Sequence, residues 1–241
     1  MTERSSVSQS KKMSEKKNVQ SAQTSEEVIA KAKDFWTRHS KIILGVGTLL
    51  VLLVGGFYVY KNYFQDPKEE KAADAMFKAE EYYRLDSLNL ALNGDGQYAG
   101  FLRIISKYGG TDAANLARFY AGSCYLKLDD NTNAIKHLKE FSSDAKQIQQ
   151  RAYKLLGDAH ADLGKSADAL DYYKKAAHHF EEDQANSAEA LFLAAYLSDR
   201  VLKNQKEAID LFKELKEKYP QTQQGMEADT YLAQLGVYNV N

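Results

Sequence analysis

The residues with the clearest potential for chemistry are two adjacent histidines, His178 and His179, followed by the acidic run 181–183. Imidazole nitrogens and carboxylates are ligands for zinc and other transition metals. Successive residues of a helix point about 100° apart, so the two histidines cannot bind one ion together. We interpret the cluster as a solvated helix end and predict no metal site.

Two other reactive side chains stand alone. Cys124 is the only cysteine, which rules out a disulfide within the chain and a cysteine-based metal site. It lies in the middle of an expected helix, where we predict a buried, inert thiol rather than a redox sensor. His160 takes an aromatic position of the repeat described below, and we predict that it packs in the core.

The chain contains none of the short motifs for phosphate binding, dinucleotide binding, a nucleophilic serine or zinc-dependent hydrolysis. An enzyme that uses two facing carboxylates, for example one that modifies peptidoglycan, is the catalytic alternative. We predict a non-catalytic protein that has no catalytic residues and no cofactor.

The elements that must position these side chains repeat about every 34 residues. Gly122 and Gly157 lie 35 positions apart, and so do Ala134 and Ala169. A helix–turn–helix unit of this length is typical of tetratricopeptide repeats. The two helices of one hairpin are expected to touch most closely at Gly157 and Ala169, where the side chains are small. A generic helical bundle is the alternative.

Residues 61–241 are predicted to form about four helical hairpins, of which the first is divergent. Its first helix is expected to have Asp66 as the N-cap and Pro67 at the first helical position, and to run to about Leu92. Residues 222–236 are predicted to cover the last hairpin as a terminal helix. Its expected apolar stripe is Met226, Tyr231, Leu232 and Leu235. The predicted fold is all-α, an α-solenoid that follows one transmembrane helix.

Stacked hairpins of this kind form a concave groove lined by their first helices. We predict that this groove binds proteins; a solvated face that binds nothing is the alternative. The predicted lining is Leu116, Phe119, Ser123, Leu126 and Lys127 in one hairpin and Arg151, Lys154, Asp158, Ala161 and Asp162 in the next. Repeats that grip a C-terminal carboxylate resemble each other in a Lys/Asn clamp, which is not expected here because Asp158 opposes Lys154.

Residues 42–60 are the most apolar stretch, with 19 residues and no charge. At about 1.5 Å per residue, a helix of this length crosses a hydrocarbon core of about 30 Å. A cleaved signal peptide is the alternative, but the polar region before it is too long and no small-residue cleavage site follows. We therefore predict an uncleaved anchor. Its expected interface residues are Trp36, Tyr58 and Tyr60, and its expected contacts with another membrane helix are Gly45, Thr48 and Gly56.

The regions that flank the span differ in charge. Residues 1–41 carry nine Lys/Arg and five Asp/Glu, whereas residues 61–241 carry 23 and 28. By the positive-inside rule, the N-terminus is cytoplasmic and the large domain lies across a bacterial inner membrane, in the periplasm. We predict that residues 1–24 are a disordered tail and that residues 25–41 are an amphipathic juxtamembrane helix in contact with lipid. A nucleic-acid partner is not expected, because no concentrated basic face is visible.

This layout, which ends in the stretch EADTYLAQLG over residues 227–236, resembles the YfgM family of ancillary SecYEG translocon subunits, and more closely its relatives in Bacteroidetes-type bacteria. The resemblance covers about residues 25–238. It implies a non-catalytic scaffold that receives emerging proteins and has SecYEG and a PpiD-like membrane-anchored periplasmic chaperone as partners. A repeat scaffold for cytochrome c maturation or another envelope assembly complex is the alternative.

Overall fold

The computed structural model describes residues 3–238, with side chains from Val28 onward. It divides into two units, Met1–Phe64 and Gln65–Asn241. The described residues contain helices and no strand, with one isolated bridge between Gly94 and Ala99. The prediction of an all-α chain is confirmed.

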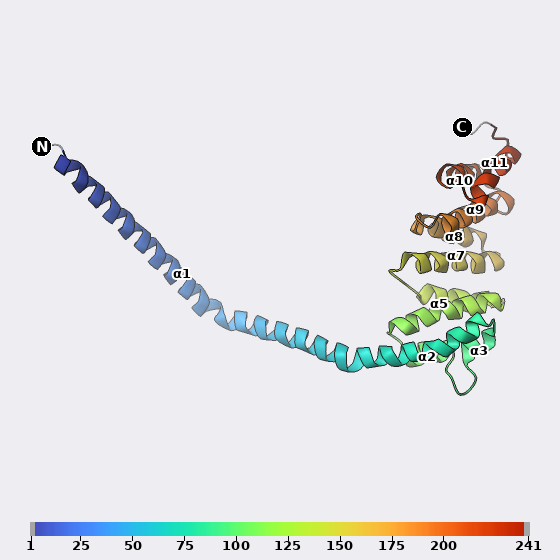
Figure 1. Cartoon of the computed structure of the whole chain (residues 1–241), viewed down its shortest axis with the longest axis horizontal. Helices are drawn as coiled ribbons and strands as arrows, with labels where there is room; N and C mark the ends of the chain where they lie inside the picture. Colours follow the sequence, from blue (N-terminus) through green and yellow to red (C-terminus); the bar gives the residue numbers. More distant parts are fainter. Residues whose placement is uncertain (1–2, 239–241) are drawn as a thin grey trace. The chain divides into compact units, whose positions relative to one another are not determined.

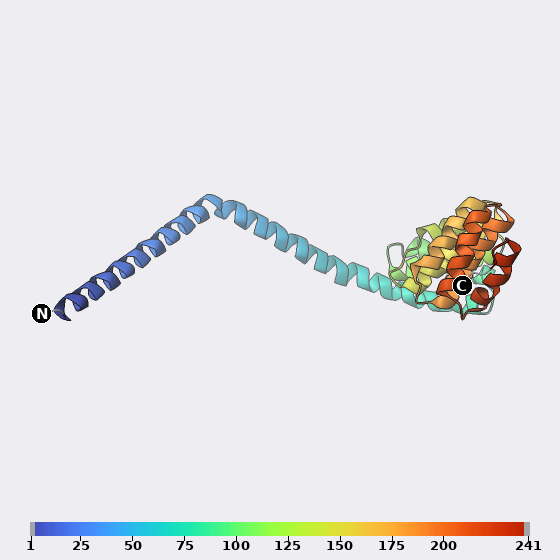
Figure 2. The same cartoon turned by 90° about the horizontal axis from the view of Figure 1, so that it is seen from above.

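The first unit is dominated by the helix α1, Glu3–Tyr60, which is followed by a short π-helical turn, Lys61–Gln65. Figures 1 and 2 show α1 as one long helical ribbon. Within the described residues, only the stretch that contains residues 42–60 is apolar and long enough to cross a membrane, and none of it is buried. An apolar stretch with no buried residue is not the core of a globular domain, so this stretch stays a candidate membrane span.

The helical backbone of α1 begins at Glu3. Its composition favours a helix, because residues 1–44 contain neither Gly nor Pro, and Lys, Glu and Gln are good helix formers. The disordered tail expected over residues 1–24 stays a prediction. No break in the helix marks the expected boundary between residues 24 and 25.

The second unit is a stack of helices. It begins with α2 (Asp66–Arg84), α3 (Leu88–Asn93) and α4 (Phe101–Lys107). Three regular hairpins follow, made of α5 (Asp112–Lys127) with α6 (Asn131–Glu140), α7 (Lys146–Asp162) with α8 (Ser166–His179), and α9 (Gln184–Arg200) with α10 (Gln205–Lys218). The helix α11 (Gln223–Gln234) closes the stack, as Figure 1 shows. The expectation of about four hairpins with a divergent first one is confirmed.

Side-chain caps explain where several of these helices start. Thr111, Asp130, Asp183, Asn204 and Thr222 each precede a helix and accept a hydrogen bond from a backbone N–H in its first turn. These caps satisfy donors that have no partner within the helix.

Two details of the first hairpin differ from the sequence prediction. Asp66 is not a cap, because Gln65 before it already has helical dihedrals. The helix α2 ends at Arg84 rather than near Leu92, and the chain turns at Asp86, whose φ is +54°. This turn lets α3 fold back so that its apolar face, including Leu92, joins the core formed by α2, α4 and α5.

The predicted close approach within hairpins is confirmed at two glycines. A Cβ atom added at Gly157 would lie 2.5 Å from Cδ1 of Tyr173 on the partner helix α8. A Cβ atom added at Gly122 would lie 2.5 Å from Cγ of Leu138 on α6. Such distances leave no room for a side chain, so these positions set how closely the helices of each hairpin pack.

The terminal helix α11 covers the last hairpin with Leu232, and Tyr231 and Leu235 pack against the same core. Met226 was wrongly placed on this stripe, since it is 65% exposed. The reason is the neighbouring Gly225: its missing side chain lets α11 approach the backbone of Tyr219, which turns Met226 outward.

The start of α2 is fastened to the start of α5 by a carboxylate. Oε2 of Glu69 accepts a hydrogen bond from the backbone N–H of Asp112 at 2.7 Å, and Oε1 accepts one from that of Ala113 at 2.8 Å. Nearby, Nζ of Lys68 donates to the carbonyl oxygen of Gly109 at 2.6 Å. A negative charge is favourable at a helix N-terminus, so Glu69 holds the divergent hairpin against the regular repeats.

Candidate protein-binding groove

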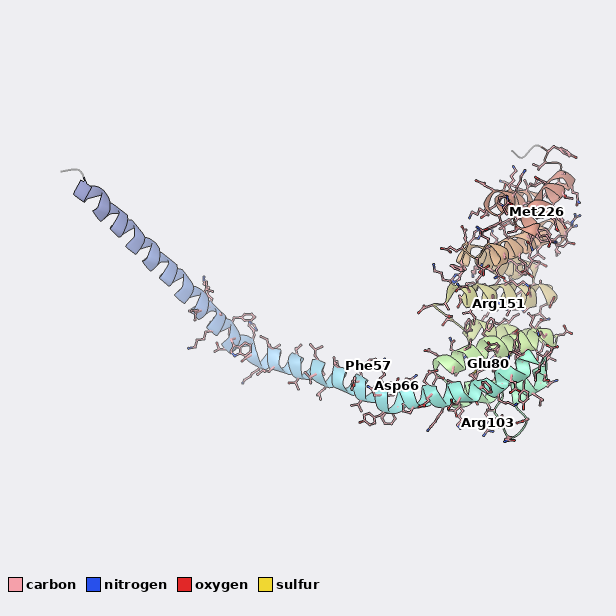
Figure 3. All side chains as sticks on the ribbon, viewed as in Figure 1. Phe57, Asp66, Glu80, Arg103, Arg151 and Met226 are labelled. Atoms are coloured by element: carbon pink, nitrogen blue, oxygen red, sulfur yellow. The ribbon has the colours of Figure 1, made fainter. Side chains whose placement is uncertain are left out.

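The first helices of successive hairpins share one face, and together they enclose a hollow of about 300 Å³, which we call the groove pocket. Its walls come from α2, α5, α7 and α9. The lining residues are Tyr83, Phe119, Ser123, Lys127, Gln150, Arg151, Lys154, Leu155, Asn186 and Glu189. Figure 3 shows Arg151 on α7, midway along the stack. A hollow on the first-helix face is the geometry that the repeat register predicts.

Five residues of the predicted lining come together in the groove pocket, namely Phe119, Ser123, Lys127, Arg151 and Lys154. Asp158 is not part of its wall but contacts Lys154 from the next turn of α7.

The remaining predicted residues lie outside the groove pocket. Leu116 lines a wider, more open hollow of about 750 Å³ between the starts of α5 and α7. Leu126, Ala161 and Asp162 line neither hollow. The role of the predicted lining in protein binding stays a prediction.

The ammonium of Lys154 is held by two carboxylates. It lies 3.1 Å from Oδ2 of Asp158 and 3.3 Å from Oε1 of Glu189 on α9. Burial opposes its charge, but the two carboxylates outweigh this and raise the pKa of Lys154. The hydroxyl of Tyr173 donates to Oδ1 of Asp158 at 3.0 Å. Lys154 is thus a fixed part of the wall, which supports the expectation that it does not act as a carboxylate clamp.

Lys127 is paired in a similar way. Its Nζ lies 2.9 Å from Oδ1 of Asp86 and 5.1 Å from the ring centroid of Tyr83. The hydroxyls of Tyr83 and Ser123 are 2.8 Å apart. Through these contacts the divergent first hairpin supplies one wall of the groove pocket.

Gln150 is one of the lining residues that the sequence reasoning missed, with Tyr83, Leu155, Asn186 and Glu189. It is 1% exposed, and its Nε2 donates to the carbonyl oxygen of Ala176 at 3.0 Å and to Oγ of Ser187 at 2.8 Å. Its Oε1 has no hydrogen-bond partner in the described part of the chain. The sequence signal that could have identified Gln150 is an amide side chain at a position of the first helix that the repeat pattern predicts to be in the core.

The side chains of His178 and His179 point in different directions, as the helix geometry predicts. Nε2 of His178 lies 2.8 Å from Oε1 of Glu214, whereas His179 turns away and packs its ring edge-on against Tyr153, with centroids 5.3 Å apart. His178, Glu181 and Glu214 lie close enough together to hold an ion.

The two carboxylates of that cluster already form ion pairs with a lysine. Nζ of Lys218 lies 2.7 Å from Glu181 and 3.1 Å from Glu214. The carboxylates raise the pKa of Lys218, so its ammonium stays charged. A divalent ion would have to displace this ammonium.

Both lone reactive residues are buried, as predicted. Cys124 is fully buried, and burial raises the pKa of its thiol to about 12. A thiol with this pKa is protonated at neutral pH, whereas the thiolate is the reactive form. His160 is 3% exposed and stacks on Tyr172 with ring centroids 5.2 Å apart.

The residues expected to act in the membrane all lie on α1 and are exposed. They are Trp36, Gly45, Thr48, Gly56, Tyr58 and Tyr60. A Cβ atom added at either glycine would meet no atom within 4 Å, so these positions are free to contact another helix.

Comparison with known families agrees with the hairpins. A family model described as a tetratricopeptide repeat matches residues 116–145 and 189–222, which fall on the α5–α6 and α9–α10 hairpins. No curated protein matches the chain significantly. The chain therefore contains tetratricopeptide repeats, a class of helical hairpin that generally forms scaffolds for protein–protein interaction and is typically non-catalytic.

Proposed function

We propose that the chain is a scaffold anchored in a bacterial inner membrane that binds polypeptides in the groove formed by its first helices. The observation that carries the proposal is the groove pocket, to which four separate helices contribute polar and apolar side chains. The candidate span in α1 supports the membrane anchor. The tetratricopeptide repeats support a role in protein interaction rather than catalysis.

In its finer form, the proposal is an ancillary translocon subunit or chaperone-like adaptor for proteins that emerge into the periplasm. The support is the resemblance of the chain to the YfgM family, which implies SecYEG and a PpiD-like chaperone as partners. The large domain, with 23 basic and 28 acidic residues, would be periplasmic, and the basic N-terminal region would be cytoplasmic.

Co-purification in mild detergent after crosslinking tests the partners. We expect the full chain to enrich translocon subunits and a membrane-anchored periplasmic chaperone. The variant Arg151→Glu, which reverses a charge in the groove pocket, should lose them, and Arg103→Glu on α4 should retain them; Figure 3 labels both positions. Equal recovery with both variants would contradict binding through the groove. Enrichment of haem-handling proteins instead would favour the scaffold for cytochrome c maturation.

A reporter fused after Asn241 tests the topology. We expect a periplasmic signal, and a cytoplasmic one would refute the translocon form of the proposal, because emerging chains would then be out of reach.

The glycine face of the span is proposed to dock on a partner helix. Gly45 and Gly56 would allow close approach, with Thr48 beside them. Replacing both glycines with Leu should reduce recovery of the membrane partner and leave the helix in the membrane. Unchanged recovery would remove this part of the proposal.

A further inference from the structure

We propose that the groove pocket selects an extended polypeptide segment in which an Asp or Glu stands next to a large apolar side chain. This deepens the proposed function and rests on it, since it names the chemistry of the ligand for the same groove. The inference draws on two features of the groove pocket: an unpaired cation and an apolar wall.

The unpaired cation is Arg151. The groove pocket contains three basic residues and one acidic residue, in a domain that carries 23 basic and 28 acidic side chains in total. Lys127 is neutralised by Asp86, and Lys154 is held by the two carboxylates described above.

The guanidinium of Arg151, by contrast, makes no ion pair or hydrogen bond within residues 28–238. Arg151 is exposed and lines the groove pocket, so its charge is open to a ligand. A guanidinium binds a carboxylate through two parallel hydrogen bonds, so the ligand group that fits Arg151 is the side chain of Asp or Glu.

The apolar wall is made by Phe119 and Leu155, with the ring of Tyr83 beside them. A volume of about 300 Å³ is at the small end for binding pockets, and it suits one large side chain rather than a folded surface. Together the two features describe a short linear segment in which an apolar residue stands next to a carboxylate side chain.

The test uses the full chain in detergent micelles and fluorescein-labelled hexapeptides with blocked ends. In the probes, a Phe-Glu or Glu-Phe pair is flanked by Gly and Ser. The matched peptides replace Glu with Gln. By fluorescence anisotropy, we expect one Glu peptide to bind about tenfold more tightly than its Gln counterpart, which corresponds to about 1.4 kcal/mol.

Two protein variants locate the effect. Arg151→Gln should bring the Glu/Gln affinity ratio close to one. Arg103→Gln makes the same change on α4, outside the groove pocket, and should leave the ratio at about ten. An equal ratio for the two variants would overturn the assignment of the carboxylate to Arg151.

The outcome also separates the two proposals. If all peptides bind equally while partner proteins still co-purify through the groove, the inference fails and the proposed function stands. If neither peptides nor partners bind, both fail.

Discussion

Replacing Glu69 with Gln should loosen the divergent first hairpin from the regular repeats. In the native chain both carboxylate oxygens of Glu69 accept backbone N–H groups at the start of α5, from Asp112 and Ala113. A glutamine at this position would have the same shape, but only its single carbonyl oxygen can accept, and its NH₂ group would face a donor. One hydrogen bond and the favourable charge at the helix N-terminus are therefore lost together.

The magnitude follows from these two losses. A hydrogen bond to a charged group contributes about 1.5–3 kcal/mol, but the amide of Asp112 is exposed and regains water, which lowers the net cost to about 1 kcal/mol. The lost charge at the helix terminus adds about 0.3–1 kcal/mol. We expect a total destabilisation of about 1–2 kcal/mol, which for a domain of this size lowers the Tm by about 2–8 °C.

Thermal unfolding of the full chain in detergent, followed by circular dichroism, measures this effect. Glu70→Gln is the matched control, since Glu70 is the exposed neighbour on the same helix and should change the Tm by less than about 1 °C. Hydrogen exchange should accelerate at the amides of Asp112 and Ala113 in the Glu69→Gln variant only. Equal Tm values for the two variants, with unchanged exchange, would refute the reasoning that Glu69 fastens the hairpin.

Three further predictions concern the core. Gly157→Val should destabilise the domain by about 2 kcal/mol in urea unfolding, because the added atoms overlap the ring of Tyr173; a wild-type midpoint would contradict the close packing. Burial lowers the pKa of His160 and of His137, so the unfolded chain binds protons first as the pH falls below about 6.5. The free energy of unfolding should therefore be highest above that pH and fall below it, by at most about 1.4 kcal/mol per pH unit for each histidine. His160→Phe should reduce this slope, and an unchanged slope would show that His160 does not contribute to it. The Cys124 thiol should resist iodoacetamide at pH 8 until the chain is unfolded, and rapid labelling of the native protein would show that its pKa is not raised.

Much of the fold was predictable because the small residues that set the helix packing recur at the same positions of each repeat. Gly122 and Gly157 are small because a side chain there would collide with the partner helix, and the collision recurs with the period of the hairpin. The apolar run of residues 42–60 is equally local. The break of α2 at Arg84 was not predictable, since no Gly or Pro marks it and Asp86 takes a positive φ there.

The groove was predictable in part for the same reason. The repeat register identified Phe119, Lys127 and Arg151, because residues at equivalent positions of first helices face the same side. It could not distinguish the cations that are paired from the one that has no partner in the described part of the chain. Which carboxylate reaches Lys127 depends on the turn at Asp86, 41 residues earlier in the chain.

From its sequence alone, this protein is determined to be a helical repeat array that follows an apolar span, because hydrophobic period and small-residue spacing report which faces must be buried. Only the tertiary structure decided that Glu69 caps a helix 43 residues away, that Met226 is exposed and that Oε1 of Gln150 is left without a partner among the described residues. These features depend on how one hairpin is rotated against the next. That rotation is set by many side-chain contacts at once, and no local sequence pattern encodes it.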